Sequence, residues 1–293
     1  MKKTLKELSP TTKSVSLILF TVFLFSLQDA IAKQLINDYP PIQVVWARYA
    51  SQSLVTILLI LPFIRKVLTT RNIKLQLVRS TFLFSATFCF FTSLKYLLLA
   101  EVNAIFQLAP LFVTALSFFI LREDVGARRW AGILFGIMGA LMIIRPGSPN
   151  FSFHMFLPAG AALFYASYLI CTKYLSSEEA ASTNFLYTSV VGAVIASILV
   201  PASWVPVALP DLLTFTTFGL MGALGHFFII VAFRIIDASF FAPFTYLQLV
   251  FGCFWGYYFF YEIPSYLTVL GGVLIVTSGI YIWHRERKRK LNS

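Results

Sequence analysis

Long runs of apolar residues alternate with short polar segments along nearly the whole chain. A helix of roughly 20 apolar residues crosses the hydrocarbon core of a bilayer. The pattern therefore predicts an all-α polytopic membrane protein with ten transmembrane helices and no strands. The predicted spans are residues 15–36, 42–64, 76–98, 102–121, 128–144, 151–174, 182–203, 211–234, 238–260 and 266–283.

The two halves of the chain share a faint pattern that repeats after 139 residues. This offset places Lys95 on Arg234, and it also places Glu123 on Glu262. Each half then holds five spans, and an odd number of crossings turns the second copy upside down in the membrane. We therefore expect a cytoplasmic N-terminal segment (1–14), two inverted five-helix repeats (15–146 and 147–283) and a basic cytoplasmic tail (284–293).

Composition agrees with a membrane protein, because 58% of the residues are hydrophobic and only 12% are charged. The net charge of +11 comes from bases that cluster in the N-terminal segment, in alternate loops and in the tail. Positive loops mark the cytoplasmic side, so both termini are predicted to be cytoplasmic and the protein to reside in the cell (inner) membrane. No basic docking face for nucleic acid is visible.

The first span also has the features of a secretory signal peptide, because lysines precede an apolar core that ends in Ala30-Ile31-Ala32. Asp29 interrupts this core, and cleavage would leave nine spans and destroy the repeat. We therefore expect the span to be retained.

Signals for an enzyme, a metal site or a cofactor are absent from the sequence. The three cysteines lie within apolar runs, and the three histidines are scattered. The chain has neither of the glycine-rich motifs that bind nucleotide phosphates. We expect no catalytic residue, metal or cofactor. His226 is interpreted either as a proton carrier or as a hydrogen-bonded helix residue.

Ionisable residues at membrane depth are costly unless they face the interior of the bundle, so they indicate candidate functional positions. Asp29, Lys33, Arg48 and Lys95 all fall in the predicted outer half of the first repeat. Arg48 and Lys95 are candidates for attracting an anionic solute. Asp29 is a candidate site for a coupling ion, proton or sodium, with a salt bridge to Lys33 as the alternative.

The second repeat places Lys173 and Arg234 on the cytoplasmic side, so the charge pattern is approximately inverted. Lys95 and Arg234 are then candidates for an outer and an inner gate, with snorkelling to the interface as the alternative. Glu123 and Glu262 are interpreted as markers of helix ends.

Polar uncharged residues within the spans complete the predicted substrate site, although helix-to-helix hydrogen bonds would explain them equally well. These residues are Gln28, Gln107, Tyr165, Tyr168, Tyr246 and Gln248. Pro110 and Pro243 remove backbone donors within spans and predict hinges or structural kinks. Paired glycines, such as Gly132 with Gly136, favour close helix packing.

Together these features resemble the drug/metabolite transporter superfamily in its EamA-type branch. The resemblance rests on ten spans in two halves, on the spacing from Pro41 to Arg48, and on Ala109-Pro110 followed by Glu123. The second half matches less well, because Gln248-Leu249 replaces Ala-Pro. The resemblance implies a central cavity formed mainly by helices 1, 3, 4, 6, 8 and 9, and secondary active transport of small metabolites.

We therefore expect a secondary active transporter that moves a small anionic or zwitterionic metabolite by alternating access. Its partners would be a small-molecule substrate, the lipid bilayer and a coupling ion. Two alternatives stay open, a non-transporting membrane scaffold or sensor and a flippase for lipid-linked metabolites. The substrate itself, the direction of transport and the oligomeric state do not follow from the sequence.

Overall fold

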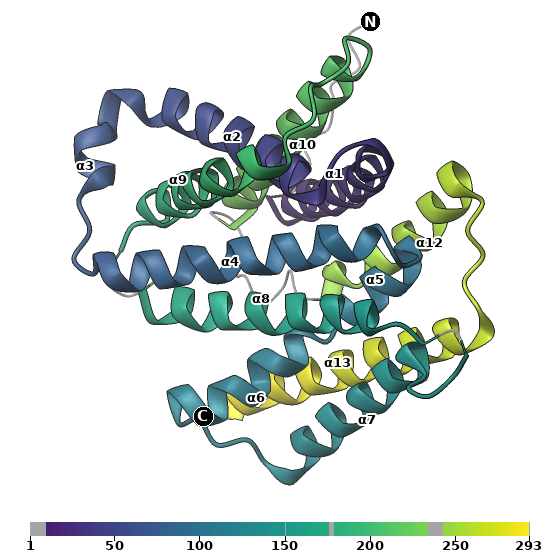
Figure 1. Cartoon of the computed structure of the whole chain (residues 1–293). Coiled ribbons are helices and arrows are strands. Elements are labelled where there is room, and N and C mark those ends of the chain that lie inside the picture. Colours follow the sequence, from purple (N-terminus) through teal and green to yellow (C-terminus); the bar gives the residue numbers. More distant parts are fainter. Residues whose placement is uncertain (1–9, 150, 176–178, 234–242, 293) are drawn as a thin grey trace, which may run out of the picture.

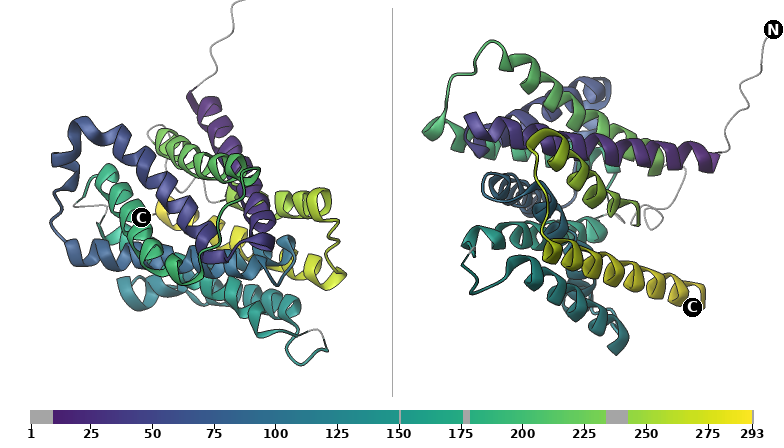
Figure 2. Two further views of the ribbon diagram at one scale, coloured as in Figure 1. Left: turned by 45° about the horizontal axis from the view of Figure 1, so that its top comes forward. Right: turned by 90° about the vertical axis from the view of Figure 1, so that its right-hand side faces the viewer.

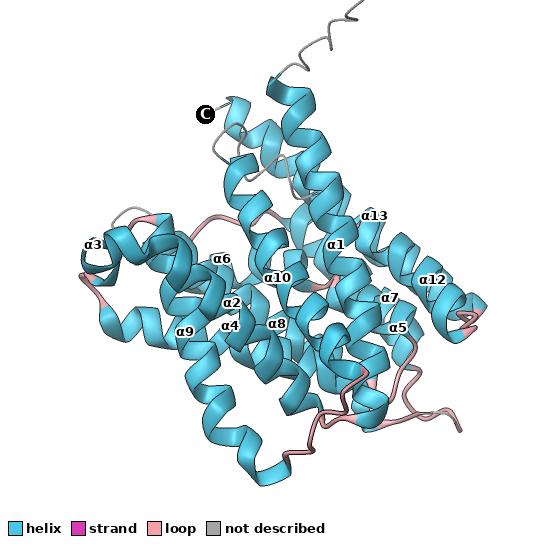
Figure 3. Ribbon diagram, turned by 90° about the horizontal axis from the view of Figure 1, so that it is seen from above, coloured by secondary structure: helices cyan, strands magenta, loops and turns pink. Residues whose placement is uncertain are grey.

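The apolar runs form helices because a chain in lipid must pair every backbone N–H and C=O within its own segment. The computed structural model describes residues 10–149, 151–175, 179–233 and 243–292. Within these ranges the chain is helical and contains no strand (Figure 3). The helices are α1 Pro10–Asp38, α2 Pro41–Ile60, α3 Ile64–Leu68, α4 Ile73–Leu94, α5 Leu99–Phe106, α6 Ala109–Leu121, α7 Ala127–Ile144, α8 Phe156–Leu175, α9 Ala181–Leu199, α10 Asp211–Phe233, α12 Leu247–Phe260 and α13 Tyr266–Asn292.

Eight helical segments among the described residues are long and apolar enough to cross a membrane. They correspond to eight of the ten predicted spans. The other two, at 211–234 and 238–260, extend into residues 234–242, which lie outside the described ranges. The eight segments are Val15–Asp38, Pro41–Phe63, Ile73–Leu94, Leu99–Leu121, Ala127–Ile144, Phe153–Leu175, Ala181–Ser203 and Tyr266–Arg285.

The third span begins earlier than predicted, at Ile73 instead of residue 76. Asn72 caps this helix, since its side chain accepts a hydrogen bond of 3.2 Å from Leu75 N. Arg79 lies within α4, in its second turn, and is buried.

The fourth span is interrupted between α5 and α6, where Gln107 and Leu108 leave the regular helix. Pro110 lies in the first turn of α6, where its missing N–H costs nothing. A second interruption occurs at Tyr246, directly before α12. Because 107 and 246 differ by the repeat offset of 139, both halves break their fourth helix at the same place.

Short connections make consecutive spans antiparallel. The third and sixth spans, α4 and α8, therefore also run in opposite directions, and Figure 1 shows them side by side. We call the end of the bundle where α1 begins the near face, and the end where α1 ends the far face. Counting along the chain, α4 and α7 also end at the far face, whereas α2, α6 and α8 end at the near face.

The packing between the two halves is reciprocal. The second helices of the two halves, α2 and α9, pack against each other, and so do the fifth helices, α7 and α13 (Figure 2). The third helix of each half packs on the first helix of the other half, which gives the pairs α4 with α8 and α10 with α1. At the α7–α13 crossing, a Cβ atom on Gly139 would lie 2.7 Å from the backbone oxygen of Gly271. Small residues thus let these two helices approach closely, as they do in other membrane bundles.

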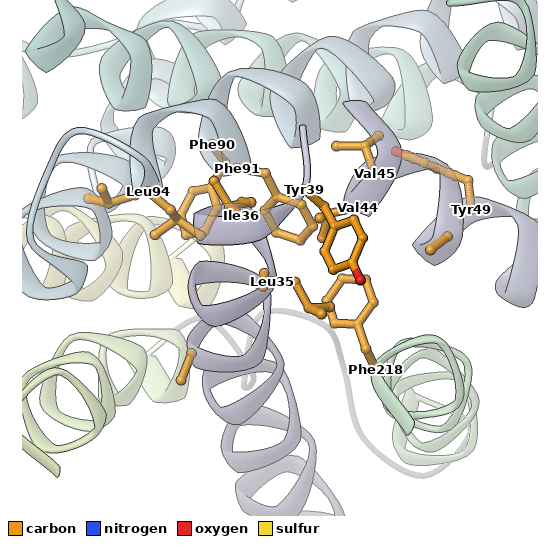
Figure 4. Packing of buried hydrophobic residues seen from close by; sticks show 14 of the residues in the cluster. Leu35, Ile36, Tyr39, Val44, Val45, Tyr49, Phe90, Phe91, Leu94 and Phe218 are labelled. Carbon is orange, nitrogen blue, oxygen red and sulfur yellow. The ribbon is translucent and has the colours of Figure 1, made fainter. Parts of the chain in front are cut away.

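Apolar side chains pack tightly where the helices meet at the far face. Figure 4 shows Leu35 and Ile36 from α1 beside Phe90 and Phe91 from α4, with Phe218 of α10 nearby. All five side chains are buried. Interdigitation of this kind excludes water, so the far face is closed at this level.

The two halves also end their fourth helices in the same way. Arg122 and Tyr261 both adopt the left-handed conformation, with φ of 54° and 53°. The next residue then donates its N–H back into the helix, from Glu123 to Ser117 O at 3.2 Å and from Glu262 to Gly256 O at 3.0 Å. The interpretation of the two glutamates as helix-end residues is confirmed.

At the near face, Glu179 links two loops, since its carboxylate accepts hydrogen bonds from Thr70 Oγ1 at 2.6 Å and from Arg71 N at 2.7 Å. The bond from the Thr70 hydroxyl holds the pKa of Glu179 below its usual value of 4.5. A carboxyl with a lowered pKa in the folded state stabilises the fold above its unfolded pKa, and this contribution is lost as the pH falls through the folded value.

We therefore expect Glu179→Gln to be less stable than the wild type at pH 7, by about 1 kcal/mol or less because the site is open to solvent. The difference should shrink as the pH falls below the ordinary glutamate pKa of about 4.3, and it should vanish below the lowered pKa of the folded state. Thermal unfolding in detergent at several pH values measures this. Asp38→Asn, which removes an exposed carboxylate, is the control. An equal difference at pH 7 and at pH 4 would contradict the expectation.

Candidate functional site

Arg48 is a half-buried cation in the middle of α2. Its guanidinium carbon lies 5.5 Å from the ring centre of Phe91, and its Nε is buried without a hydrogen-bond partner. It forms no ion pair with any carboxylate that the structure describes. A guanidinium in this condition is prepared to bind an external anion, because part of its hydrogen-bonding capacity is unused.

Side chains from three other helices lie within electrostatic range of this guanidinium. Arg48 interacts electrostatically with Asp29 of α1, Tyr165 of α8 and His226 of α10. The Asp29 carboxylate is itself half-buried and makes no hydrogen bond or ion pair within the described ranges. An unpaired acid and an unpaired base therefore lie near one another where helices from both halves meet.

Aromatic rings connect this charged pair to the interruption of the fourth span. Tyr165 lies 5.5 Å from Phe106 and 5.8 Å from Tyr168, measured between ring centres. Phe106 in turn lies 5.1 Å from Phe90, almost at right angles to it. Such rings offer flat apolar surfaces and phenolic hydroxyls, which suit an organic solute with both apolar and polar parts.

The two interrupted helices touch each other, because Gln107 Nε2 donates a hydrogen bond of 2.9 Å to the backbone oxygen of Thr245. In transporters, interrupted helices expose backbone groups near the middle of the membrane, where solutes bind. Gln107 thus holds the two interruptions together and lies one residue from Phe106.

Arg79, which is not among the predicted site residues, is the most deeply buried cation in the described ranges, with 1% of its surface exposed. It donates hydrogen bonds to Thr188 Oγ1 at 2.6 Å, to Thr172 Oγ1 at 3.2 Å and to the backbone oxygen of Asn184. Its guanidinium carbon also lies 5.2 Å from the ring centre of Tyr168. Gln76, Arg79 and Ser80 are spaced so that they share one face of a helix. That spacing is the feature of the sequence that indicates a buried polar face here.

The alternative of a salt bridge between Asp29 and Lys33 is wrong. Lys33 Nζ lies 2.5 Å from Glu262 Oε1 and also donates to the backbone oxygen of Leu97 at 2.5 Å. Lys33 turns toward the end of the fourth helix of the other half, because a carboxylate and a carbonyl meet there. This leaves Asp29 without a salt bridge in the described ranges, and Arg48 is the cation that lies within electrostatic range of it.

Several predicted site residues lie elsewhere. Gln28 donates a hydrogen bond of 2.9 Å to Phe218 O and packs against Gly222, so it joins α1 to α10. The hydroxyl of Tyr246 contacts Gly279 of α13. Lys95 is exposed directly after α4.

The remaining predicted positions are near the edge of the described ranges or beyond it. Arg234 lies outside them. Pro243 begins the range that contains α12, and Gln248 is half-buried in the first turn of that helix. Among the described residues, no cluster of three or more His, Cys, Asp or Glu is placed to hold a metal ion.

The sequence matches the EamA-like transporter family twice, over residues 12–145 and 152–283. It is 25% identical over 263 residues to an S-adenosylmethionine uptake transporter of Rickettsia prowazekii, covering 90% of both chains. It is 28% identical over 271 residues to the pseudopaline exporter CntI of Pseudomonas aeruginosa, covering 91% of this chain and 94% of the exporter.

A riboflavin transporter of Vibrio cholerae is 34% identical over 190 residues, 64% of each chain. A solved crystal structure with 20% sequence identity superposes with a TM-score of 0.62 and covers 92% of this chain and 96% of that chain. The fold therefore occurs in an experimentally determined structure.

Proposed function

This chain belongs to the EamA-like transporter family, and we propose that it carries a small metabolite with an anionic group, such as a zwitterion, across the membrane by alternating access. The half-buried guanidinium of Arg48, which forms no salt bridge among the described residues and whose buried Nε has no hydrogen-bond partner, is the observation that carries this proposal. A solute carboxylate or phosphate would complete its hydrogen bonds. We further propose that the protein resides in the inner membrane with both termini in the cytoplasm.

Each nearby group has a role in this proposal. Tyr165 and Phe106 flank the organic part of the solute, and Gln107 fixes the two interrupted helices beside it. Asp29 either holds a cationic group of the solute or takes up the coupling ion. The two halves, which pack reciprocally, rock about the site so that it faces each side in turn.

The similar proteins support transport and leave the direction open. Those named above carry out S-adenosylmethionine uptake, riboflavin transport and pseudopaline export. These are three different solutes, so the solute of this chain follows from its own residues and not from the family.

A flippase for lipid-linked metabolites would need a polar groove that opens to the bilayer. The groove of about 390 Å³ between α12 and α13 is lined mainly by apolar side chains, such as Leu247, Val250 and Val273, and by no charged one. A polar headgroup would lose its hydration there without compensation. Arg48 and Asp29 do not line this groove. Their position away from it favours a soluble solute over a lipid-linked one.

Uptake and counterflow in proteoliposomes test the proposal, with a panel of amino acids, nucleosides, vitamins and other carboxylated or zwitterionic metabolites. We expect protein-dependent flux of at least one anionic or zwitterionic solute. The Asp29→Asn variant is measured with and without an imposed proton or sodium gradient, and loss of the response to the gradient alone would place the coupling ion at Asp29. Protein-free liposomes are the control. Absence of flux across the whole panel under every gradient would refute the transporter.

A further inference from the structure

Two ion pairs join the halves of the protein, one at each end of the bundle. Lys33 Nζ lies 2.5 Å from Glu262 Oε1, and Lys173 Nζ lies 2.5 Å from Glu123 Oε1. In each pair the lysine lies near the end of the first helix of one half, and the glutamate follows the fourth helix of the other half. Both pairs therefore connect one half to the other.

The two pairs are equivalent in the repeat. Glu123 and Glu262 are separated by 139 residues, and Lys33 and Lys173 by 140. The two glutamates also follow matching left-handed residues and make matching backbone hydrogen bonds. The internal repeat therefore accounts for both ion pairs, because each half supplies the same lysine and glutamate positions.

The equivalent pairs lie on opposite faces. Lys33 is near the end of α1 at the far face, whereas Lys173 is near the end of α8 at the near face. Between these two helix ends the chain crosses five times, through α2, α4, the α5–α6 segment, α7 and α8. An odd number of crossings moves the equivalent position from one face to the other.

The surroundings of the two pairs differ. The side chains of Lys33 and Glu262 are 10% and 12% exposed, whereas those of Lys173 and Glu123 are 58% and 45% exposed. At the far face, Leu99 N donates a further hydrogen bond of 2.8 Å to Glu262. The apolar cluster in Figure 4 packs in the same region, around the ends of α1 and α4. The far-face pair thus belongs to a closed end, and the near-face pair to a more open one.

Burial decides which pair holds the halves together. Removing one partner of a buried pair leaves an uncompensated charge, whereas an exposed pair contributes little because water screens it. If one half rocks against the other, the symmetry of the fold exchanges the two environments. The near-face pair would then be buried and the far-face pair exposed.

We propose that Lys33–Glu262 and Lys173–Glu123 are alternating latches, the first closing the far face and the second closing the near face. This inference rests on the proposed transport function, because only alternating access requires both ends to open. In the conformation described here the far-face latch is closed.

Reporter cysteines on α4 make the two faces measurable separately. Ser93→Cys lies near the far face and Ser80→Cys near the near face, and both serines are 0% exposed. The reporters are introduced after Cys89, Cys171 and Cys253 are replaced by alanine, in protein reconstituted in liposomes. The labelling rate with a membrane-impermeant maleimide is then measured on each side.

Lys33→Gln is expected to raise the labelling rate of Ser93→Cys about tenfold or more, with little change at Ser80→Cys. Lys173→Gln is expected to raise labelling of Ser80→Cys much less, because its pair is already exposed. Lys33→Arg keeps a cation that can donate to Glu262 and to Leu97 O, so it should keep labelling slow at Ser93→Cys. Slow labelling in Lys33→Arg beside fast labelling in Lys33→Gln would distinguish a latch from a general loss of folding.

Two results would overturn the latches. One is an unchanged labelling rate at Ser93→Cys in both Lys33→Gln and Glu262→Gln. The other is an equal rise at both reporters, which would indicate general loosening. The assay needs no known solute, so its outcome is independent of the flux measurements. Flux with an unchanged labelling rate would refute the latches and leave the transport function standing. Unequal labelling without flux would refute transport, and with it the alternation, and would leave only an ion pair that closes the far face.

Discussion

Replacing Arg48 by glutamine is expected to lower kcat/KM for solute transport about 10- to 100-fold. A hydrogen bond to a charged group contributes about 1.5–3 kcal/mol, and Arg48 forms no salt bridge in the described ranges that would compete with the solute. The fold should persist, because the guanidinium makes no internal ion pair that the substitution would break. Initial rates of uptake in proteoliposomes, matched for protein content, provide the measurement.

Two further variants sharpen this prediction. Arg48→Lys keeps the charge but loses the planar fork that binds two oxygens at once, so it should recover only part of the rate. Arg128→Gln makes the same change at an exposed position in α7 and should transport normally. Wild-type rates in Arg48→Gln, or equal losses in Arg48→Gln and Arg128→Gln, would remove Arg48 from the substrate site.

The second large effect concerns the crossing of α7 and α13. Gly139→Val is expected to lower the free energy of unfolding by about 3 kcal/mol. Its Cβ would lie 2.7 Å from the backbone oxygen of Gly271, and a backbone oxygen cannot move aside without separating the helices. Thermal unfolding in detergent, followed by the yield of monodisperse protein, measures the loss.

Gly160→Val is the matched control, since it makes the same change within α8 where no atom lies within 4 Å of the added Cβ. It carries the same cost of placing valine in a helix but no steric clash. Equal stability of the two variants would show that α7 and α13 do not pack through Gly139.

The class of the protein and its helices could be predicted from the sequence. Apolar runs are long enough to cross a bilayer, and lipid forces such runs into helices, so eight of the ten predicted spans are found among the residues that the structure describes. The family resemblance is confirmed, because the family matches twice along the chain. The equivalence of Glu123 and Glu262 could also be predicted, since both end a helix in the same conformation.

The candidate site could be predicted only in part. Arg48 was selected because a cation within an apolar run must face something polar. Arg79 is not among the predicted site residues, because its partners Thr172, Asn184 and Thr188 come from helices that only the tertiary structure brings together. Gln28 and Tyr246 were selected as site residues, yet they contact neighbouring helices.

The sequence by itself determined which segments cross the membrane and which residues are equivalent in the two halves. Both properties follow from local hydrophobicity and from spacing along the chain. Only the tertiary structure decided which charges pair. Lys33 binds Glu262 rather than Asp29, although Asp29 lies only four residues away. The partners of a buried charge are set by which helix ends meet in space, and Lys33 and Glu262 meet through the packing of one half against the other.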